Sequence, residues 1–194
     1  MRSKVTILRT KAIIALGANL PLGEMLPRDI LLAAIKELTL LLGELCQVSR
    51  LFQTPCFPVG AGPDYVNAAM TVETTLSPSD LLQHLHGIEQ QFSRLREQRW
   101  GMRTLDLDLI AVGDQVLPDN AGYMYWYDLA VEQQMKEAPK ELILPHPRLQ
   151  DRAFVLVPLC DICPDWRHPV LGKTILELRD ALPKSELEAV LPVE

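Results

Sequence analysis

Hydrophobic and polar positions follow two different periods along this chain, and each change of period marks a new element. Residues 11–16 are almost all apolar and predict a buried strand that ends at Gly17-Ala18-Asn19. Apolar residues at helical spacing then predict a helix over residues 27–42, which Gly43 ends. Residues 45–52 have the composition of a second strand.

The same order of elements follows in the next fifty residues. Prolines and glycines make residues 54–63 an irregular loop, and residues 65–74 predict a third strand. The apolar residues expected on one face of that strand are Val66, Ala68, Met70 and Val72. Ser77-Pro78 is typical of a helix start, and the helix is expected to run to about residue 94. Residues 104–112 alternate strictly and predict a fourth strand.

The order strand, helix, strand, strand, helix, strand is that of the split βαβ arrangement, an antiparallel sheet with helices packed on its face. We expect C-terminal additions to it, with residues 152–159 helical or extended and a helix near residues 174–182. Residues 118–141 differ in character, and we interpret them as an insertion within a single domain spanning residues 1–194. Within the insertion, residues 128–136 are expected to form a short helix. Four of the five residues at 123–127 are aromatic.

Composition narrows the class of protein. The 194 residues are 48% hydrophobic and 23% charged, so the chain can bury a core and is not disordered. Its apolar runs are too short for a membrane span or a signal peptide, which predicts a cytoplasmic protein with no membrane partner. The net charge of −6 argues against nucleic acid as a partner. The four cysteines lack the paired spacing of a zinc site and are expected to be buried or half-buried and reduced, with metal or redox chemistry as the alternative.

Two aspartates in the fourth strand are the sharpest candidates for chemistry. Side chains two apart in a strand share a face, which places Asp106 and Asp108 together with Cα atoms about 6.5 Å apart. Their repulsion is about 2 kcal/mol at an effective dielectric constant of about 20, and a bound cation removes it. Oxygen-only ligands suit Mg²⁺, which bridges to substrate phosphates. The alternative is a solvent-facing strand with two ordinary acids.

The residues before that strand are strongly basic. Four arginines against one glutamate give residues 94–103 a charge of +3, so the rest of the chain carries −9. Such a loop beside paired acids is typical of a metal–polyphosphate site, in which arginines bind phosphate oxygens. A solvated, arginine-rich helix end is the alternative interpretation. The arginines are Arg94, Arg96, Arg99 and Arg103, with Trp100 among them.

A third candidate region is the stiff turn Pro145-His146-Pro147-Arg148, which Arg152 and Phe154 follow. A fixed backbone favours a positioned histidine and arginine near a ligand. A capped turn with a surface histidine would have the same sequence.

Together these residues resemble the family of 6-hydroxymethyl-7,8-dihydropterin pyrophosphokinases. The matching pieces run in order along the chain: Gly17-Ala18-Asn19-Leu20, Thr54-Pro55, residues 63–69, Ile88-Glu89, Arg99-Trp100-Gly101, residues 103–108, residues 144–148 and Arg152-Ala153-Phe154. The block at residues 99–109 is highly specific. The chain departs from the family pattern at His86, Ser93 and Met102.

The resemblance implies a ferredoxin-like α+β sandwich (βαββαβ) and transfer of pyrophosphate from ATP, the co-substrate, to the pterin hydroxymethyl group, with release of AMP in folate biosynthesis. It implies that Asp106 and Asp108 bind two Mg²⁺ ions and that Arg94 and Arg103 take part in catalysis. The implied ATP-binding residues are Glu89, Arg96, Trp100, Arg103, His146 and Arg152. The implied pterin-binding residues are Thr54, Pro55, Phe57, Tyr65, Asn67, Trp100 and Phe154.

We expect the aromatic cluster at residues 123–127 of the insertion to pack over the nucleotide side or to form a homo-oligomer contact.

A flat pterin with polar edges requires aromatic faces and an amide that both donates and accepts hydrogen bonds, which Asn67 supplies. Two other functions use the same residue types. One is a two-metal nucleotide phosphohydrolase or nucleotidyltransferase, and the other is a non-catalytic module that binds a nucleotide or a pterin.

Overall fold

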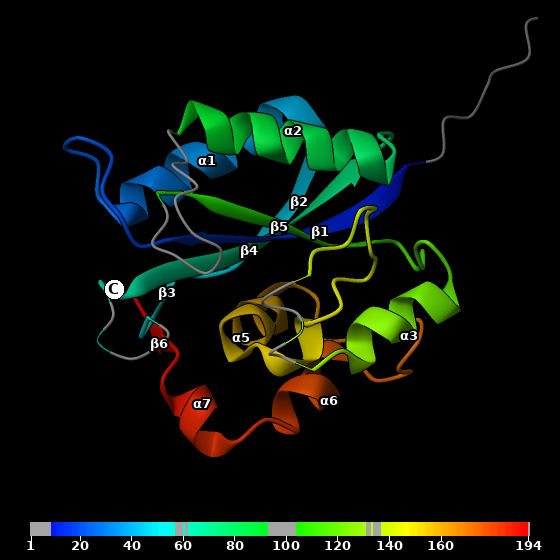
Figure 1. Cartoon of the computed structure of the whole chain (residues 1–194). Helices are drawn as coiled ribbons and strands as arrows, with labels where there is room; N and C mark the ends of the chain where they lie inside the picture. Colours follow the sequence, from blue (N-terminus) through cyan, green and yellow to red (C-terminus); the bar gives the residue numbers. More distant parts are fainter. Residues whose placement is uncertain are drawn as a thin grey trace, which may run out of the picture.

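The computed structural model describes residues 9–56, 60, 62–92, 104–130, 133 and 137–193. An antiparallel sheet lies at its centre, in the strand order β5-β1-β4-β3-β6, and β2 also pairs with β4 (Figure 1). The strands are β1 Thr10–Ala18, β2 Glu44–Val48, β3 Phe52–Thr54, β4 Tyr65–Thr74, β5 Asp106–Val112 and β6 Leu191–Pro192. Helices cover both faces of this sheet.

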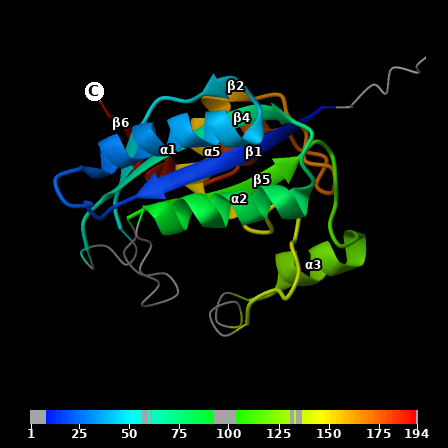
Figure 2. The same cartoon turned by 90° about the horizontal axis from the view of Figure 1, so that it is seen from above.

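The first face is covered by α1 (Pro27–Leu42) and α2 (Pro78–Gln91), which lie side by side over the strands (Figure 2). The even-numbered residues of β1 and β4 point into this core, as their alternation predicts. The predicted cap is present, because the Ser77 side chain accepts a hydrogen bond from the Asp80 amide. Gly43 ends α1 at φ 139°, and a Cβ there would come within 2.3 Å of the Glu73 carbonyl oxygen.

The C-terminal additions cover the second face, where α5 (Ala153–Ile162) packs on the odd-numbered residues of β1 and β4. The segment expected to be helical or extended is therefore a helix. The expected helix near residues 174–182 is α6 (Ile175–Asp180), and the short helix α7 (Lys184–Glu188) follows it. The strand order and the two helices on one face confirm the predicted βαββαβ arrangement.

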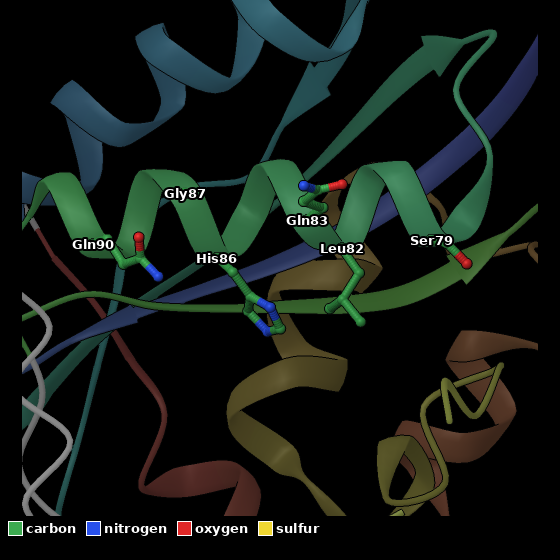
Figure 3. A pocket seen from close by; sticks show the side chains of 6 residues that line it. All are labelled: Ser79, Leu82, Gln83, His86, Gly87 and Gln90. Carbon is green, nitrogen blue, oxygen red and sulfur yellow. The ribbon is translucent and has the colours of Figure 1, made fainter. Parts of the chain in front are cut away.

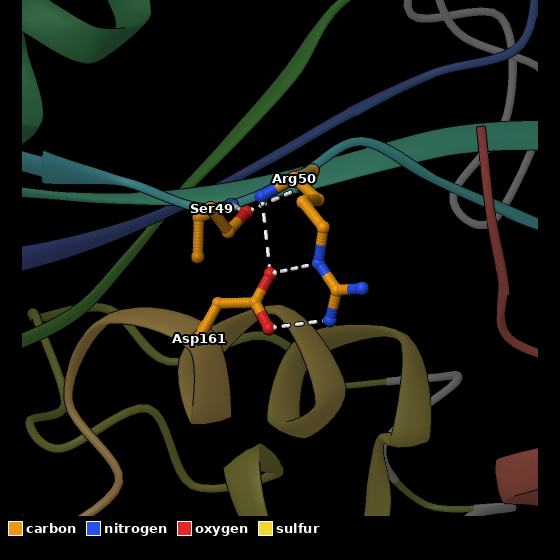
Figure 4. A network of polar contacts seen from close by, with 4 residues as sticks. Ser49, Arg50 and Asp161 are labelled. Atoms are coloured by element: carbon orange, nitrogen blue, oxygen red, sulfur yellow. Dashed lines mark hydrogen bonds and ion pairs between the residues drawn. The ribbon is translucent and has the colours of Figure 1, made fainter. Parts of the chain in front are cut away.

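The second predicted strand, over residues 45–52, is wrong as a single element. It is two strands, β2 and β3, both paired with β4, and the chain changes direction between them at Ser49 and Arg50. The Ser49 hydroxyl accepts a hydrogen bond from the Ala69 amide. Asp161 on α5 accepts three hydrogen bonds from Arg50, from the backbone amide, Nε and Nη2, at 2.8 to 3.1 Å (Figure 4). These contacts hold the break against the second layer.

Two bulges interrupt the otherwise regular ladders. The register of β2 on β4 shifts between Leu45 and Gln47, which leaves Cys46 as the extra residue. The register of β1 on β5 shifts next to Ile14, where Leu109 and Ala111 pair with successive residues. Strict alternation along β5 is therefore wrong at Ile110 and Ala111, which both pack in the second core. The bulge turns the end of β5 without disturbing the residues before it.

The aromatic cluster of the predicted insertion forms its own helix, α3 (Asn120–Asp128), earlier than the expected helix at residues 128–136, most of which lies outside the described residues. The segment leaves and returns at one point, because Leu117 and Leu144 exchange backbone hydrogen bonds of 2.9 and 3.2 Å. Tyr123 is fully buried, and its hydroxyl lies 3.0 Å from Nε2 of His168. The helix therefore packs against the C-terminal segment of its own chain.

His168 is buried with a defined tautomer. Its Nδ1 accepts hydrogen bonds from the amides of Val170 and Leu171, each 3.2 Å long, so the proton lies on Nε2 and is donated to Tyr123. Burial lowers the pKa of His168 to about 4. Burial also raises the pKa of the Cys160 and Cys163 thiols, and all four cysteines are free, as predicted. The expectation of a buried or half-buried thiol is wrong at Cys46, which is exposed because β2 is exposed along its length.

No helix in the part of the chain that the structure describes has both the length and the apolar character needed to cross a membrane.

We expect the stability of the protein to depend on the neutral form of His168. Its pKa is about 4 when folded and about 6.5 when unfolded, so the unfolded state binds more protons between these values. The free energy of unfolding should therefore rise with pH across this window, by up to about 1.4 kcal/mol per pH unit from this residue. Urea unfolding at pH 4.5 and pH 7 of the native protein and of the His168→Gln variant checks this, because the variant should lose that part of the slope. Equal slopes in the two proteins would contradict it.

Candidate active site

One row of residues across the second face of the sheet defines the candidate site. In the antiparallel registers, Gly17 on β1 pairs with Asp106 on β5 and with Asn67 on β4, which in turn pairs with Phe52 on β3. Paired residues of neighbouring strands lie on the same face. Asp106 and Asn67 are therefore two strand spacings apart, about 10 Å between Cα atoms. An acidic group and an amide group thus face the same space from two strands.

Gly17, in the middle of this row, has no side chain to project from the sheet. A Cβ at this position would lie 3.2 Å from Oδ1 of Asn67 and 3.8 Å from the ring of Tyr65. The missing side chain leaves room for a flat ligand to lie between the carboxylate and the amide. The sequence pattern identified Gly17 only as the end of a strand and as part of one matching family piece, and gave no sign of this role.

The predicted metal ligands share one face, as expected, although that face is only partly open to solvent. Asp106 and Asp108 are half-buried, and Oδ2 of Asp108 lies 3.1 Å from Nη1 of Arg152. Two carboxylates on one face form an oxygen donor set that suits Mg²⁺, which takes its remaining ligands from water and phosphate. In the described part of the chain no group of three or more acidic, histidine or cysteine side chains could enclose a metal by itself. The donor set therefore fits a cation that is completed by a substrate.

The predicted turn at His146 lies against the same strand. Its backbone amide donates a 2.8 Å hydrogen bond to the carbonyl of Ile110, directly beyond the aspartates. Nδ1 of His146 accepts from the Arg148 amide at 3.1 Å, so the neutral ring carries its proton on Nε2. Burial, together with the positive charge of Arg152, lowers the pKa of His146 well below its usual value. The structure thus places a neutral hydrogen-bond donor beside the acidic pair.

The predicted pterin residues gather at the other end of the row. Asn67 is 4% exposed, and its Nδ2 donates a 2.8 Å hydrogen bond to the hydroxyl of Thr54. Tyr65, half-buried, pairs with Thr54 across β3 and β4. Phe154, on α5, is 40% exposed, and the guanidinium carbon of Arg152 lies 5.7 Å from its ring centroid. Pro55, by contrast, is exposed at the start of the following loop.

Glu89 has a different position from the other candidates. It lies on the inner face of α2, 1% exposed, and its Oε1 accepts a 2.9 Å hydrogen bond from the amide of Leu107. Leu107 stands between the two aspartates on a strand that pairs only with β1 among the described strands. Glu89 therefore stabilises the outer edge of the strand that carries the acidic pair. Its contact with ATP stays a prediction.

Five of the predicted site residues lie outside the described residues. They are Phe57, Arg94, Arg96, Trp100 and Arg103.

A shallow hollow on α2 is separate from these residues. One stripe of the helix lines it, with Leu82 and His86 pointing from the same side (Figure 3). The lining residues are Ser79, Leu82, Gln83, His86, Gly87 and Gln90. None of the predicted ligand residues belongs to this stripe, and Glu89 is buried, 1% exposed.

The solved structures that this chain resembles share its fold. The HPPK-DHPS of Plasmodium falciparum superimposes with a TM-score of 0.63 over 89% of this chain, at 16% sequence identity. A further HPPK-DHPS structure, in complex with substrates, gives a TM-score of 0.65 over 93% of this chain, at 14% identity. This chain spans 44% of each of those longer chains. The fold is thus the ferredoxin-like fold found in HPPK domains.

Sequence similarity is more specific than the fold. Residues 13–164 match the family described as 7,8-dihydro-6-hydroxymethylpterin-pyrophosphokinase (HPPK), and the chain belongs to this family. The 2-amino-4-hydroxy-6-hydroxymethyldihydropteridine pyrophosphokinase of Synechocystis is 41% identical over 94% of this chain and 80% of its own length. The protein of the same name from Pseudomonas aeruginosa is 36% identical over 90% of this chain and 93% of its own length.

We expect Glu89→Ala to destabilise the protein by about 1 to 3 kcal/mol, because the buried amide of Leu107 loses its acceptor. Glu89→Gln is the matched control, since its amide oxygen can still accept this hydrogen bond. Thermal unfolding of the two variants measures the difference. Equal loss of stability in both variants would contradict the assigned role and indicate that the charge of Glu89 matters more than the hydrogen bond.

Proposed function

We propose that this protein transfers pyrophosphate from ATP to the hydroxymethyl group of 6-hydroxymethyl-7,8-dihydropterin and releases AMP. The observation that carries the proposal is the shared row on the sheet, where a carboxylate pair and a hydrogen-bonded amide face one another across Gly17. Membership of the HPPK family supplies the identity of the two substrates. The reaction belongs to folate biosynthesis.

The amide end of the row is suited to the pterin. The Nδ2 of Asn67 is already engaged with Thr54, which orients the amide and leaves Oδ1 toward the gap above Gly17. An oriented acceptor of this kind selects a ring edge that donates hydrogen bonds. The exposed ring of Phe154 provides an aromatic face on the other side. We propose that the pterin-binding residues are those that the family resemblance implies, namely Thr54, Pro55, Phe57, Tyr65, Asn67, Trp100 and Phe154.

The acidic end is suited to the metal–nucleotide complex. We propose that Asp106 and Asp108 hold two Mg²⁺ ions, which would neutralise charge on the phosphates during transfer. Arg152 donates a hydrogen bond to Asp108, so its positive charge lies beside the proposed metal site. There it could also bind an oxygen of a phosphate that the metal holds. His146, neutral and with its Nε2 proton available, is a hydrogen-bond donor to the same phosphates. The arginines Arg94, Arg96 and Arg103, with Glu89 and Trp100, complete the proposed ATP and catalytic set.

The chemistry demands positioning more than proton transfer. The hydroxymethyl oxygen attacks the β-phosphorus of ATP, the bond from that phosphorus to the α-phosphate oxygen breaks, and AMP departs. Residues that hold the two substrates in line and compensate the charge of the phosphates therefore account for most of the catalysis. The arrangement of the row provides this, because the amide on β4 and the acids on β5 are both held by ladders to β1, the strand between them.

The identity of the nucleotide product tests the proposed reaction. With ATP, Mg²⁺ and hydroxymethyl-dihydropterin, we expect one AMP for each pterin diphosphate, measured by chromatography of the quenched reaction. Release of ADP or free phosphate would indicate the phosphohydrolase or nucleotidyltransferase alternative. Binding of both ligands without turnover would indicate the non-catalytic module.

We expect Asp106→Asn to lower turnover by about 100-fold or more while the protein remains folded, because a neutral amide is a weak Mg²⁺ ligand on a half-buried face. Asp114→Asn is the matched control, since Asp114 lies in the turn after β5, outside the proposed site. Steady-state AMP release and circular dichroism measure the two effects. A rate for Asp106→Asn close to that of the control would show that the metal assignment is wrong.

Three further properties accompany this proposal and stay predictions. They are a cytoplasmic location, the absence of nucleic-acid and membrane partners, and self-association through the insertion. Burial of Tyr123 within the chain leaves Tyr125, 55% exposed, as the aromatic residue of α3 most open to a second copy.

A further inference from the structure

The C-terminal segment, residues 184–193, lies beside the amide end of the candidate site. It contains α7 and β6, and β6 pairs antiparallel with β3 beside Thr54 (Figure 1). The amide of Val193 adds a 2.8 Å hydrogen bond to the carbonyl of Leu51. This segment lies beyond residue 164, where the match to the family ends.

Val190 is the buried residue of this segment. It is 8% exposed, and with Phe52 and Ala153 it forms a small core separate from the two larger ones. Phe52 pairs with Asn67 and lies two residues before Thr54 on the same strand. Ala153 stands between Arg152 and Phe154 in the sequence. Val190 thus packs between two elements that each carry proposed ligand residues.

The two elements depend on Val190 to different degrees. α5 has its own large core on the sheet, formed by Val155, Leu156, Leu159 and Ile162, and Arg152 is bonded to Asp108. β3 has only three residues, and its side away from β4 is bounded by β6. A strand of three residues is held only weakly by its own backbone hydrogen bonds. A change at Val190 should therefore move β3 more than it moves Arg152. It would shift Thr54 and so disturb the hydrogen bond that orients Asn67 on β4.

We propose that Val190 and the strand β6 position β3 for pterin binding, so that the C-terminal segment of this chain sets the affinity for the pterin and not for ATP. The proposal rests on the proposed function. Val190 is a positioning residue, because it acts through Phe52 and touches no substrate in this arrangement.

The test compares Val190→Ala with two controls. Leu191→Ala alters the neighbouring residue, whose side chain is 58% exposed and lies outside the small core. Leu178→Ala removes a buried side chain of α6 that packs in the second core away from β3, and so matches the loss of stability. For Val190→Ala we expect the KM for hydroxymethyl-dihydropterin to rise roughly tenfold, with the KM for ATP within about twofold of the native value. Both controls should keep the native ratio of the two constants.

A conservative variant and a direct binding measurement complete the test. Val190→Ile keeps a branched apolar side chain and should retain most of the pterin affinity, whereas removal of residues 184–194 should weaken it at least as much as Val190→Ala. Pterin dissociation constants from equilibrium dialysis decide the proposal even if the native protein releases no AMP, an outcome that would overturn only the proposed function. Equal pterin affinity in Val190→Ala and the native protein, or an equal rise of both KM values, would overturn the positioning role.

Discussion

The register of β1 between β4 and β5 is the constraint on which the rest of the molecule depends. β1 pairs with β4 along all of its nine residues, and its even-numbered residues from 12 to 18 are buried in the core under α1 and α2. A shift by one residue would turn that whole apolar set toward the other face, so a single register is strongly favoured. The same register leaves Gly17 between Asp106 and Asn67. The packing of one face of the sheet thereby fixes the geometry of the candidate site on the other.

Much of this fold could be predicted because the governing contacts are local or periodic. Alternation over β4 and helical spacing over α1 identified both elements and their buried faces, and the cap at Ser77 marked the start of α2. The break between β2 and β3 could not be predicted, because it depends on Asp161, more than a hundred residues away, binding Arg50. The bulge at Ile110 was hidden for a similar reason, since either face of β5 accepts an apolar residue there once α5 covers the sheet.

The candidate site divides along the same line. The acidic pair and Asn67 were recognisable from residue type, spacing and family resemblance, because strand geometry converts spacing into a shared face. The contributions of Phe52 and Val190 had no local pattern, since each is an ordinary apolar residue that matters only through its partner. Arg152 was predicted as a ligand of ATP, and its hydrogen bond to Asp108, which no sequence pattern indicates, also makes it part of the support of the acidic pair. The half-buried setting of that pair required knowledge of the second layer, which the strand pattern does not contain.

The outer strand β6 has one more consequence, for the behaviour of the protein at high concentration. A strand with a free edge is a template on which another chain can extend the sheet, and such edges promote aggregation. β6 is only two residues long and contains Pro192, which has no amide hydrogen to offer an incoming strand. The bulge at Cys46 distorts the exposed strand β2, which also makes that strand a poor template for pairing with another chain. The strand β6 thus supports β3 and also ends the sheet on this side. Its short, proline-containing edge does not favour the addition of a further strand.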